Sequence, residues 1–170
     1  TWFATVACTG FDACVNERAN RLPWPAGPRR YDLAILAELA AFHARPVLIR
    51  TEAESLDLDA TLIAVANTPF YGGGIPICPA ADPADGLFDV TVVGKATRRE
   101  LLSMLPRLRA GKHLTHPAVR TLRAREVHLE GVGWPVYADG EPIGALPTGL
   151  RCEPGALTVV QAPEGHHDGV

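Results

Sequence analysis

The sequence predicts a mainly β protein of the α+β class, a β-sandwich-like domain with two or three peripheral helices. Short apolar runs rich in β-branched residues recur along the chain, and glycine and proline turns separate them. Two longer stretches instead repeat apolar residues at the spacing of one helical face. Strands and helices do not alternate regularly, which argues against a doubly wound sheet. At 170 residues, the chain has the size of one domain.

The first half of the chain contains two of the expected helices. A strand over residues 2–8 is expected to lead into a short helix that Asp12 caps and that reaches Asn20. A longer helix is expected from residue 31 to residue 43, and Pro46 ends it because proline cannot continue a helix. Strands are then expected over residues 47–51, 61–66 and 88–93.

The second half contains one more helix and a series of short strands. Thr97 is expected to cap the helix, with Glu100 at the capping-box position, and Gly111 is expected to end it. Apolar residues lie on one side of this helix, at positions 101, 105 and 108. Beyond it, strands are expected over residues 119–122, 126–129, 136–138, 149–152 and 156–160.

Residues 66–90 form a segment whose composition is too constrained for a simple connection. It joins two expected strands through a loop of glycine, proline and aspartate. The consecutive glycines at positions 72–74 allow positive φ angles and a close approach of the backbone, and the prolines stiffen the path. The loop is therefore a candidate binding segment.

The bulk composition excludes several classes of protein. The net charge of -3 argues against a dedicated nucleic-acid-binding protein. The four cysteines are scattered without a CxxC pair, which favours reduced thiols in the cytosol over a disulfide framework or a zinc site. No apolar run reaches the roughly 20 residues that a membrane-spanning helix needs. The histidines and serines suggest no site.

Several short motifs occur in one order along the chain and together indicate a family. They are TGFDA at residues 9–13, Asn67, YGGG at 71–74, PA at 79–80, DGLFDV at 85–90, GKH at 111–113, DGE at 139–141 and PGAL at 154–157. This ordered set resembles the C-terminal domain of the bacterial diacylglycerol kinase family, which also includes sphingosine and ceramide kinases. The resemblance extends from Thr1 to about Pro163. Its departures are small, such as Phe88 where the family more often has leucine.

One departure from the family is large. A complete enzyme of this family has an N-terminal domain with a nucleotide loop of the type GGDGT, and this chain contains no such loop. The resemblance therefore implies that residues 1–163 form the acceptor-side domain of a two-domain kinase and that residues 164–170 form a flexible tail. ATP, bound mainly by the missing domain, is the expected co-substrate, and Mg²⁺ is the expected cofactor. The chain alone is expected to be inactive.

Asp139 is the candidate catalytic residue. It follows an apolar run at residues 136–138 and precedes Gly140, so that a turn would expose its carboxylate at the end of a strand. On local sequence alone, an Asp-Gly pair between strands is most often a plain hairpin turn. The resemblance implies instead that Asp139 removes the proton of the lipid hydroxyl. Glu141 would assist on the nucleotide or metal side, or it is a solvated carboxylate of the same turn.

The loop within residues 66–90 contains two further candidate sites. The resemblance implies a structural metal held by Asp82, Asp85 and Asp89 and by the backbone carbonyl of Leu87, since Mg²⁺ prefers oxygen ligands. The alternative is that these aspartates only cap turns beside the neighbouring proline and glycine residues. A second group could bring backbone amides near phosphates in the cleft between the two domains, or it simply lets the chain turn. Its members are Asn67, Gly72, Gly73 and Gly74.

Between residues 95 and 125 the chain is strongly basic, and Glu100 is the only acidic residue in this run. Such a run could dock on an anionic membrane surface, or it could be the solvated face of a helix and a strand. The residues expected to face the membrane are Arg98, Arg99, Arg107, Arg109 and Lys112. Together with the reduced cysteines, this run predicts a cytoplasmic protein that associates peripherally with membranes.

These observations lead to one hypothesis and two alternatives. The chain is expected to be the C-terminal domain of an ATP-dependent lipid kinase that transfers the γ-phosphoryl group to the hydroxyl of diacylglycerol or a related lipid alcohol. The alternatives are a kinase domain for sphingoid bases or ceramide, and a lipid-binding module without catalysis. The expected partners are the lipid, an anionic membrane surface, its own N-terminal domain and a second copy in a possible homodimer. No nucleic acid is expected to bind.

Overall fold

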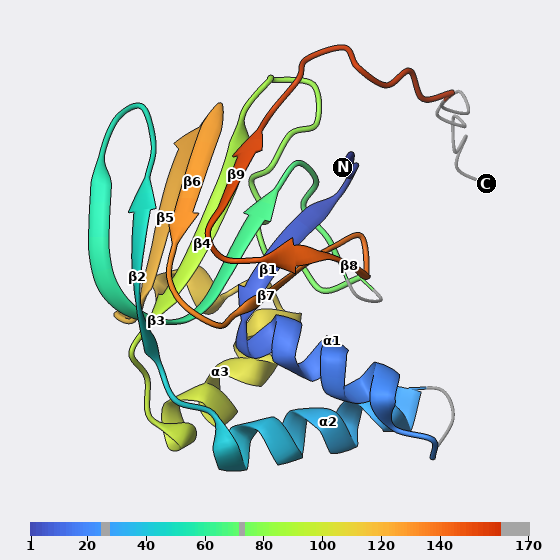
Figure 1. Ribbon diagram of the computed structural model, residues 1–170, viewed down its shortest axis with the longest axis vertical. Helices are drawn as coiled ribbons and strands as arrows, with labels where there is room; N and C mark the ends of the chain where they lie inside the picture. The colour runs from blue at the N-terminus through green and yellow to red at the C-terminus, as the bar shows by residue number, and fades with distance from the viewer. Residues whose placement is uncertain (25–27, 72–73, 161–170) are drawn as a thin grey trace, which may run out of the picture.

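The computed structural model describes residues 1–24, 28–71 and 74–160 (Figure 1). Its helices are α1 (Phe11–Arg21), α2 (Pro28–Ala41) and α3 (Arg98–Arg109), followed by a short 3-10 helix η1 (His113–Thr115). Its strands are β1 (Val6–Gly10), β2 (Arg45–Arg50), β3 (Ser55–Ala66), β4 (Phe88–Gly94), β5 (Val119–Ala124), β6 (Glu126–Glu130), β7 (Pro135–Ala138), β8 (Glu141–Ala145) and β9 (Thr148–Arg151).

The strand β3 connects two layers of one antiparallel sheet. Its first half pairs with β2, which continues to β6 and β9, and its second half pairs with β1 and β4. From there the sheet extends through β1 to β7 and β8, and through β4 to β5. The register shifts between Ala60 and Leu62, at the point where β3 passes from one set of partners to the other. The sheet nearly closes on itself, and the predicted β-sandwich-like fold with peripheral helices is confirmed.

The main hydrophobic core lies between the layers. Alternate residues of a strand point to the same face of the sheet. In β4 these are Phe88, Val90 and Val92, and all three belong to this core. Trp134 is the largest side chain in this core, and it is 1% exposed. The β-branched residues of the neighbouring strands fill the remaining space, so that the sheet is held by non-local packing.

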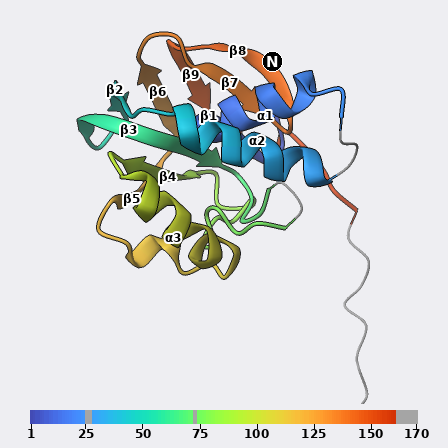
Figure 2. The same ribbon diagram turned by 90° about the horizontal axis from the view of Figure 1, so that it is seen from below.

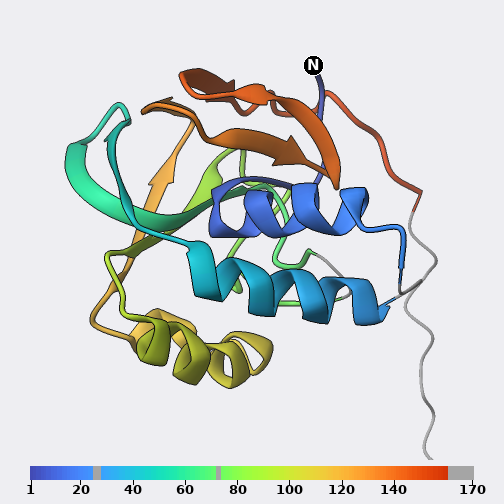
Figure 3. The same ribbon diagram turned by 60° about the horizontal axis from the view of Figure 1, so that its bottom comes forward.

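The other face of the sheet carries the helices. Figures 2 and 3 show α1, α2 and α3 gathered on one side of the strands. Here Leu62, Ala64 and Val93 of the sheet pack with Met104 of α3, and a separate small cluster joins α1 to α2. The helices do not cover the end of the sheet at which β1 begins and β7 ends. Side chains can be presented there.

Several predicted boundaries were wrong for identifiable reasons. β1 begins at Val6 rather than at Trp2, whose side chain is exposed. Asp12 lies within α1, and no side chain caps this helix at Gly10. Pro46 belongs to β2, five residues after the end of α2. The capping box of α3 is confirmed, because Thr97 Oγ1 accepts from Glu100 N at 3.3 Å and Glu100 Oε2 accepts from Thr97 N at 2.7 Å.

Two strand predictions in the last third of the chain also differ from the structure. No strand forms over residues 156–160, and these residues are exposed. Strand β8 was not predicted, because Pro142 and Gly144 interrupt its sequence and most of its residues are exposed. It forms because the turn at Asp139 and Gly140 brings it back along β7.

Candidate functional site

Asp139 occupies the turn between β7 and β8, at the free end of the sheet. Its φ angle is 51° and that of Gly140 is 87°, values typical of a tight hairpin turn. Asp139 and Gly140 therefore form the hairpin turn that the local sequence predicts. The turn also leaves the Asp139 side chain exposed, as a catalytic role would require. The backbone N–H of Asp139 donates to the carbonyl of Val6 at 3.1 Å, which ties the turn to the start of β1.

The carboxylate of Asp139 is held by the two residues before β1. Ala4 N donates to Oδ2 at 2.7 Å, Thr5 N donates to Oδ1 at 2.9 Å, and the Thr5 hydroxyl also donates to Oδ1. Burial acts to raise the pKa of Asp139, but these hydrogen bonds to the charged form outweigh it and hold the pKa below its usual value. Asp139 is therefore ionised and fixed in orientation.

Asn67 binds the same dipeptide as Asp139, namely Ala4 and Thr5, although 72 positions separate the two residues in the sequence. It follows the last residue of β3, and its backbone N–H donates to Thr5 O at 2.8 Å. Its side-chain Nδ2 donates to Ala4 O at 3.0 Å. Asn67 and Asp139 thus hold the same dipeptide from the two strands that flank β1.

Of the other residues predicted for the cleft and the turn, the structure describes Gly74 and Glu141. Gly72 and Gly73 lie outside the described residues. Gly74 has a φ angle of 90°, in the region that favours glycine. Glu141 is exposed at the first position of β8, paired in register with Ala138. Its predicted role on the nucleotide side stays a prediction.

The acidic loop contains turns and ion pairs. Asp82 Oδ1 accepts from Ala84 N at 2.9 Å, and Asp85 Oδ1 accepts from Leu87 N at 2.8 Å, as the alternative reading of turn-capping aspartates predicts. The second oxygen of Asp85 forms an ion pair with Arg123 Nη2.

Asp89 also contacts this arginine, with 3.4 Å between its Oδ2 and Arg123 Nε. Burial raises the pKa of Asp89, and Arg123 acts in the opposite direction. A guanidinium group therefore already lies between Asp85 and Asp89, where a cation would bind.

The residues of this loop, as folded, do not fit a metal ion. Across residues 1–24, 28–71 and 74–160, no group of three or more histidine, cysteine or carboxylate side chains is placed to hold one. A divalent cation between Asp85 and Asp89 would have to displace the positive charge of Arg123. The predicted metal site stays a prediction that rests on the family resemblance alone.

The basic run includes helix α3, and the arginines of this helix lie on its exposed side. With 3.6 residues per turn, its arginines spread around the side opposite Leu101, Met104 and Leu108, which face the sheet. Arg98 is not free to bind lipid, because its Nη2 donates to Ala40 O of α2 at 2.6 Å. The remaining predicted membrane-facing residues are exposed, namely Arg99, Arg107, Arg109 and Lys112.

No described helix is long and apolar enough to cross a bilayer.

A cavity that the sequence did not reveal lies between the helices and the sheet. Its volume is about 100 Å³, and its walls come from α1, α2, α3, the outer face of the sheet and the loop after β3. Most of the lining side chains are apolar, including Ile35, Leu39, Leu62, Met104 and Leu108. Such a lining suits the hydrocarbon part of a ligand. The apolar side of α3 predicted one wall, but no local pattern indicated that three helices and two strands would enclose a space.

Two polar groups in this cavity have buried atoms that lack a hydrogen-bond partner among the described residues. They are Asp12 Oδ2 and His113 Nδ1. Burial raises the pKa of Asp12, and hydrogen bonds with Cys8 and Tyr71 only partly offset this. His113 Nε2 lies 2.9 Å from Ile77 O, so this nitrogen carries the proton and Nδ1 is left as an acceptor. The cavity therefore combines apolar walls with two polar groups that each keep one buried atom without a partner among the described residues.

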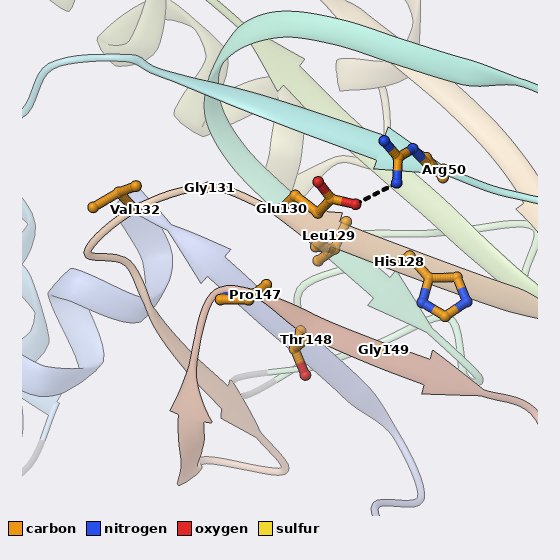
Figure 4. Close-up of a pocket in the computed structure, with 9 residues that line it drawn as sticks. All are labelled: Arg50, His128, Leu129, Glu130, Gly131, Val132, Pro147, Thr148 and Gly149. Atoms are coloured by element: carbon orange, nitrogen blue, oxygen red, sulfur yellow. Dashed lines mark hydrogen bonds and ion pairs between the residues drawn. The ribbon is translucent and has the colours of Figure 1, made fainter.

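A second hollow, broad and open, lies on the surface at β2, β6 and β9 (Figure 4). Its residues include His128, Pro147 and Thr148. Figure 4 shows its arginine, Arg50, paired with Glu130, and 2.5 Å separates Arg50 Nη1 from Glu130 Oε1. This pairing leaves no free charge at the hollow with which to recognise a ligand.

Comparison with known proteins identifies the family. Residues 5–161 match the family described as the YegS C-terminal NAD kinase beta sandwich-like domain. A diacylglycerol kinase from Mycobacterium tuberculosis is 44% identical over 165 residues, which are 96% of this chain and 53% of that protein. A diacylglycerol kinase from Staphylococcus carnosus is 26% identical over 132 residues, 77% of this chain and 43% of that protein.

A crystal structure of a diacylglycerol kinase from Bacillus anthracis has a similar fold. Its TM-score is 0.62 at 22% identity, and the match covers 90% of this chain and 50% of that one. The chain spans about half the length of the curated relatives that it matches most fully. It belongs to the YegS C-terminal domain family, and it corresponds to the C-terminal domain of the diacylglycerol kinase and YegS-like lipid kinases.

Proposed function

We propose that this chain is the acceptor-side domain of an ATP-dependent lipid kinase, which phosphorylates the hydroxyl of diacylglycerol or a related lipid alcohol. The observation that carries the proposal is the fixed, ionised carboxylate of Asp139 at the free end of the sheet, held by the dipeptide that Asn67 also binds. Phosphoryl transfer needs such a group to orient the attacking hydroxyl and to take its proton. The membership in a family of kinases supports the same reaction.

The cavity beside α3 would receive part of the lipid's hydrocarbon. Its apolar lining supports this assignment, but a volume of about 100 Å³ admits only a short segment of an acyl chain. We infer that α3 moves away from α1 and α2 when the lipid binds. Few contacts join α2 to α3, the hydrogen bond from Arg98 to Ala40 among them, so separating these two helices breaks little structure, while Met104 holds α3 on the sheet.

The nucleotide would come from the other part of the complete protein. ATP would bind mainly to the N-terminal domain, with Asn67 and Glu141 facing its phosphates from this side. Mg²⁺ bound to ATP would screen the phosphate charge during transfer. The exposed arginines of α3 would hold the cytoplasmic enzyme on an anionic membrane, where its substrate lies.

The test uses the full-length protein that contains this chain. Asp139→Asn should lower lipid phosphorylation at least about 100-fold, because the amide cannot accept the proton. Asp57→Asn is the matched control, since Asp57 is an exposed carboxylate on β3. Circular dichroism would check that both variants fold. An Asp139→Asn enzyme with normal activity would overturn the assignment.

A panel of lipids identifies the acceptor. Radiolabelled ATP would be supplied with diacylglycerol, a sphingoid base or ceramide in mixed micelles. Phosphorylation of diacylglycerol alone supports the main proposal, and phosphorylation of another lipid replaces it with the alternative substrate. If the folded full-length protein binds lipid but phosphorylates none of them, the lipid-binding module without catalysis is the correct reading.

A further inference from the structure

The two oxygens of the Asp139 carboxylate are not equally occupied by hydrogen bonds. An ionised carboxylate offers about four lone-pair positions, two on each oxygen. Oδ1 accepts two hydrogen bonds, one from the backbone N–H of Thr5 and one from its hydroxyl. Oδ2 accepts one, from the backbone N–H of Ala4. Oδ2 thus accepts fewer of these hydrogen bonds than Oδ1, and the backbone N–H of Val6 also favours the charged form of the carboxylate.

Thr5 is itself held in place by the sheet. Its carbonyl accepts from Asn67 N at 2.8 Å, and the next residue, Val6, opens β1 and pairs in register with Ala66. The carbonyl of Val6 in turn accepts from the backbone N–H of Asp139. Because the backbone is tied on both sides, the hydroxyl of Thr5 cannot leave Oδ1 without a rotation of its own side chain.

We propose that Thr5 is a positioning residue of the active site, whose hydroxyl fills Oδ1 of Asp139 and leaves Oδ2 as the atom that receives the substrate. This inference rests on the proposed function. In the reaction, the lipid oxygen forms a bond to the γ-phosphorus of ATP while the bond from that phosphorus to the β,γ-bridging oxygen breaks. ADP leaves with the electron pair, and the hydroxyl proton of the lipid moves to Oδ2 of Asp139.

The same contact also sets the basicity of Asp139. Each hydrogen bond to the ionised carboxylate favours that form, so removal of one raises the pKa. A purely structural role for Thr5 would change the stability of the protein or its activity at every pH. A positioning role predicts in addition that the acid side of the pH profile moves.

The experiment compares three variants of the full-length protein. Thr5→Val keeps the β-branched shape but loses the hydroxyl, and Thr5→Ser keeps the hydroxyl. Thr9→Val is the matched control, because Thr9 lies on β1, the strand that Thr5 precedes, and its hydroxyl donates to Pro135 O at 2.8 Å, away from Asp139. The measurements are kcat and KM for the lipid from pH 4 to 9, with a thermal unfolding curve for each variant.

For Thr5→Val we expect the acid limb of kcat/KM to move up by about one pH unit, with kcat lowered about tenfold and little change in KM. Thr5→Ser should resemble the wild type. Thr9→Val should lower the unfolding temperature and leave the pH profile in place. The proposal is overturned if Thr5→Val is folded and its acid limb superimposes on that of the wild type, whatever its activity.

A readout that does not depend on catalysis separates this inference from the proposed function. The pKa of Asp139 can be followed by NMR of its ¹³C-labelled side-chain carboxyl in the wild type and in Thr5→Val, or in Thr5→Ala if the valine variant does not fold. A higher pKa in the variant supports the contact, and an equal pKa overturns it. If Asp139→Asn keeps full activity, the role of Asp139 as base fails, and the NMR result still decides whether Thr5 controls its carboxylate.

Discussion

Arg123 lies directly opposite Asp89 in the register of β5 and β4, and 3.4 Å separates its Nε from the Asp89 Oδ2 atom. The same guanidinium reaches Asp85 in the preceding loop. A cation from the protein itself therefore neutralises the loop that the sequence suggested as a metal site. The side chain of Arg123 is 53% exposed, so solvent weakens these pairs.

Removal of this arginine should make the loop sensitive to magnesium. We expect Arg123→Met to lower the unfolding temperature by about 2–4 °C in EDTA, because Asp85 and Asp89 lose their partner. Magnesium should raise the unfolding temperature of this variant and leave that of the wild type unchanged. Arg120→Met, an exposed arginine of the same strand, controls for the loss of charge. A wild type that magnesium stabilises more than the variant would contradict the prediction.

His113 should contribute to the loss of stability in acid. Burial lowers its pKa in the folded protein, whereas the unfolded chain has the ordinary value of about 6.5. Stability is therefore complete above that value and decreases as the pH falls below it, because only the unfolded state takes up the proton readily. His113→Gln keeps a donor near the carbonyl of Ile77 and does not titrate.

Urea denaturation at pH 7, 6 and 5 would measure this effect. The loss of unfolding free energy between pH 7 and pH 5 should be smaller in His113→Gln than in the wild type. His128→Gln is the control, since the side chain of His128 is 59% exposed. Equal losses in the wild type and in His113→Gln would show that other groups cause the acid sensitivity.

Filling the cavity should select against long lipids. Met104 is buried in its wall, and Met104→Phe adds volume to a space of about 100 Å³. We expect kcat/KM of the full-length enzyme to fall about tenfold for long-chain diacylglycerol and to change little for a short-chain analogue. Met104→Leu, which conserves volume, should behave as the wild type. Equal effects on both chain lengths would place the acyl chain elsewhere.

The exposed arginines of α3 should contribute to membrane binding. Replacement of Arg99, Arg107 and Arg109 by glutamine should weaken binding to vesicles with anionic phospholipid at least about tenfold, since each basic residue near the surface contributes about 1 kcal/mol. Higher salt should reduce the difference between the wild type and the triple variant. Arg120→Gln is the single-charge control. Unchanged sedimentation of the triple variant with vesicles would assign the basic run to a solvated surface.

Local rules predicted the parts of the fold that depend on neighbours in the sequence. The capping box of Thr97 and Glu100 is confirmed because both partners lie within one helical turn. The first half of β3 was not predicted, because Asp57 and Asp59 alternate with apolar residues and only pairing with β2 makes this stretch a strand. Conversely, the apolar residues at 156–160 find no partner strand and remain exposed.

In the candidate site, too, local sequence predicted single residues but not the contacts between distant segments. The DGE motif indicated Asp139, but the contacts that hold it come from Ala4 and Thr5, which resemble any residues before a strand. The pairing of Arg123 with Asp85 depends on the register of β4 and β5, which the sequence does not reveal. The cavity depends on three helices and two strands that meet only in the folded protein.

The position of β3 in both layers has a consequence for cooperativity. Neither half of the sheet can open without disturbing this strand, so local unfolding around β2, β6 and β9 would reach the residues that hold Asn67 and Asp139. Amide hydrogens in the second half of β3, at Ile63 and Val65, should then exchange with deuterium at a rate set by global unfolding. A substitution at Ala60, which is 0% exposed where the strand changes partners, would loosen the end of the sheet that carries Asn67 and Asp139 without contacting either residue.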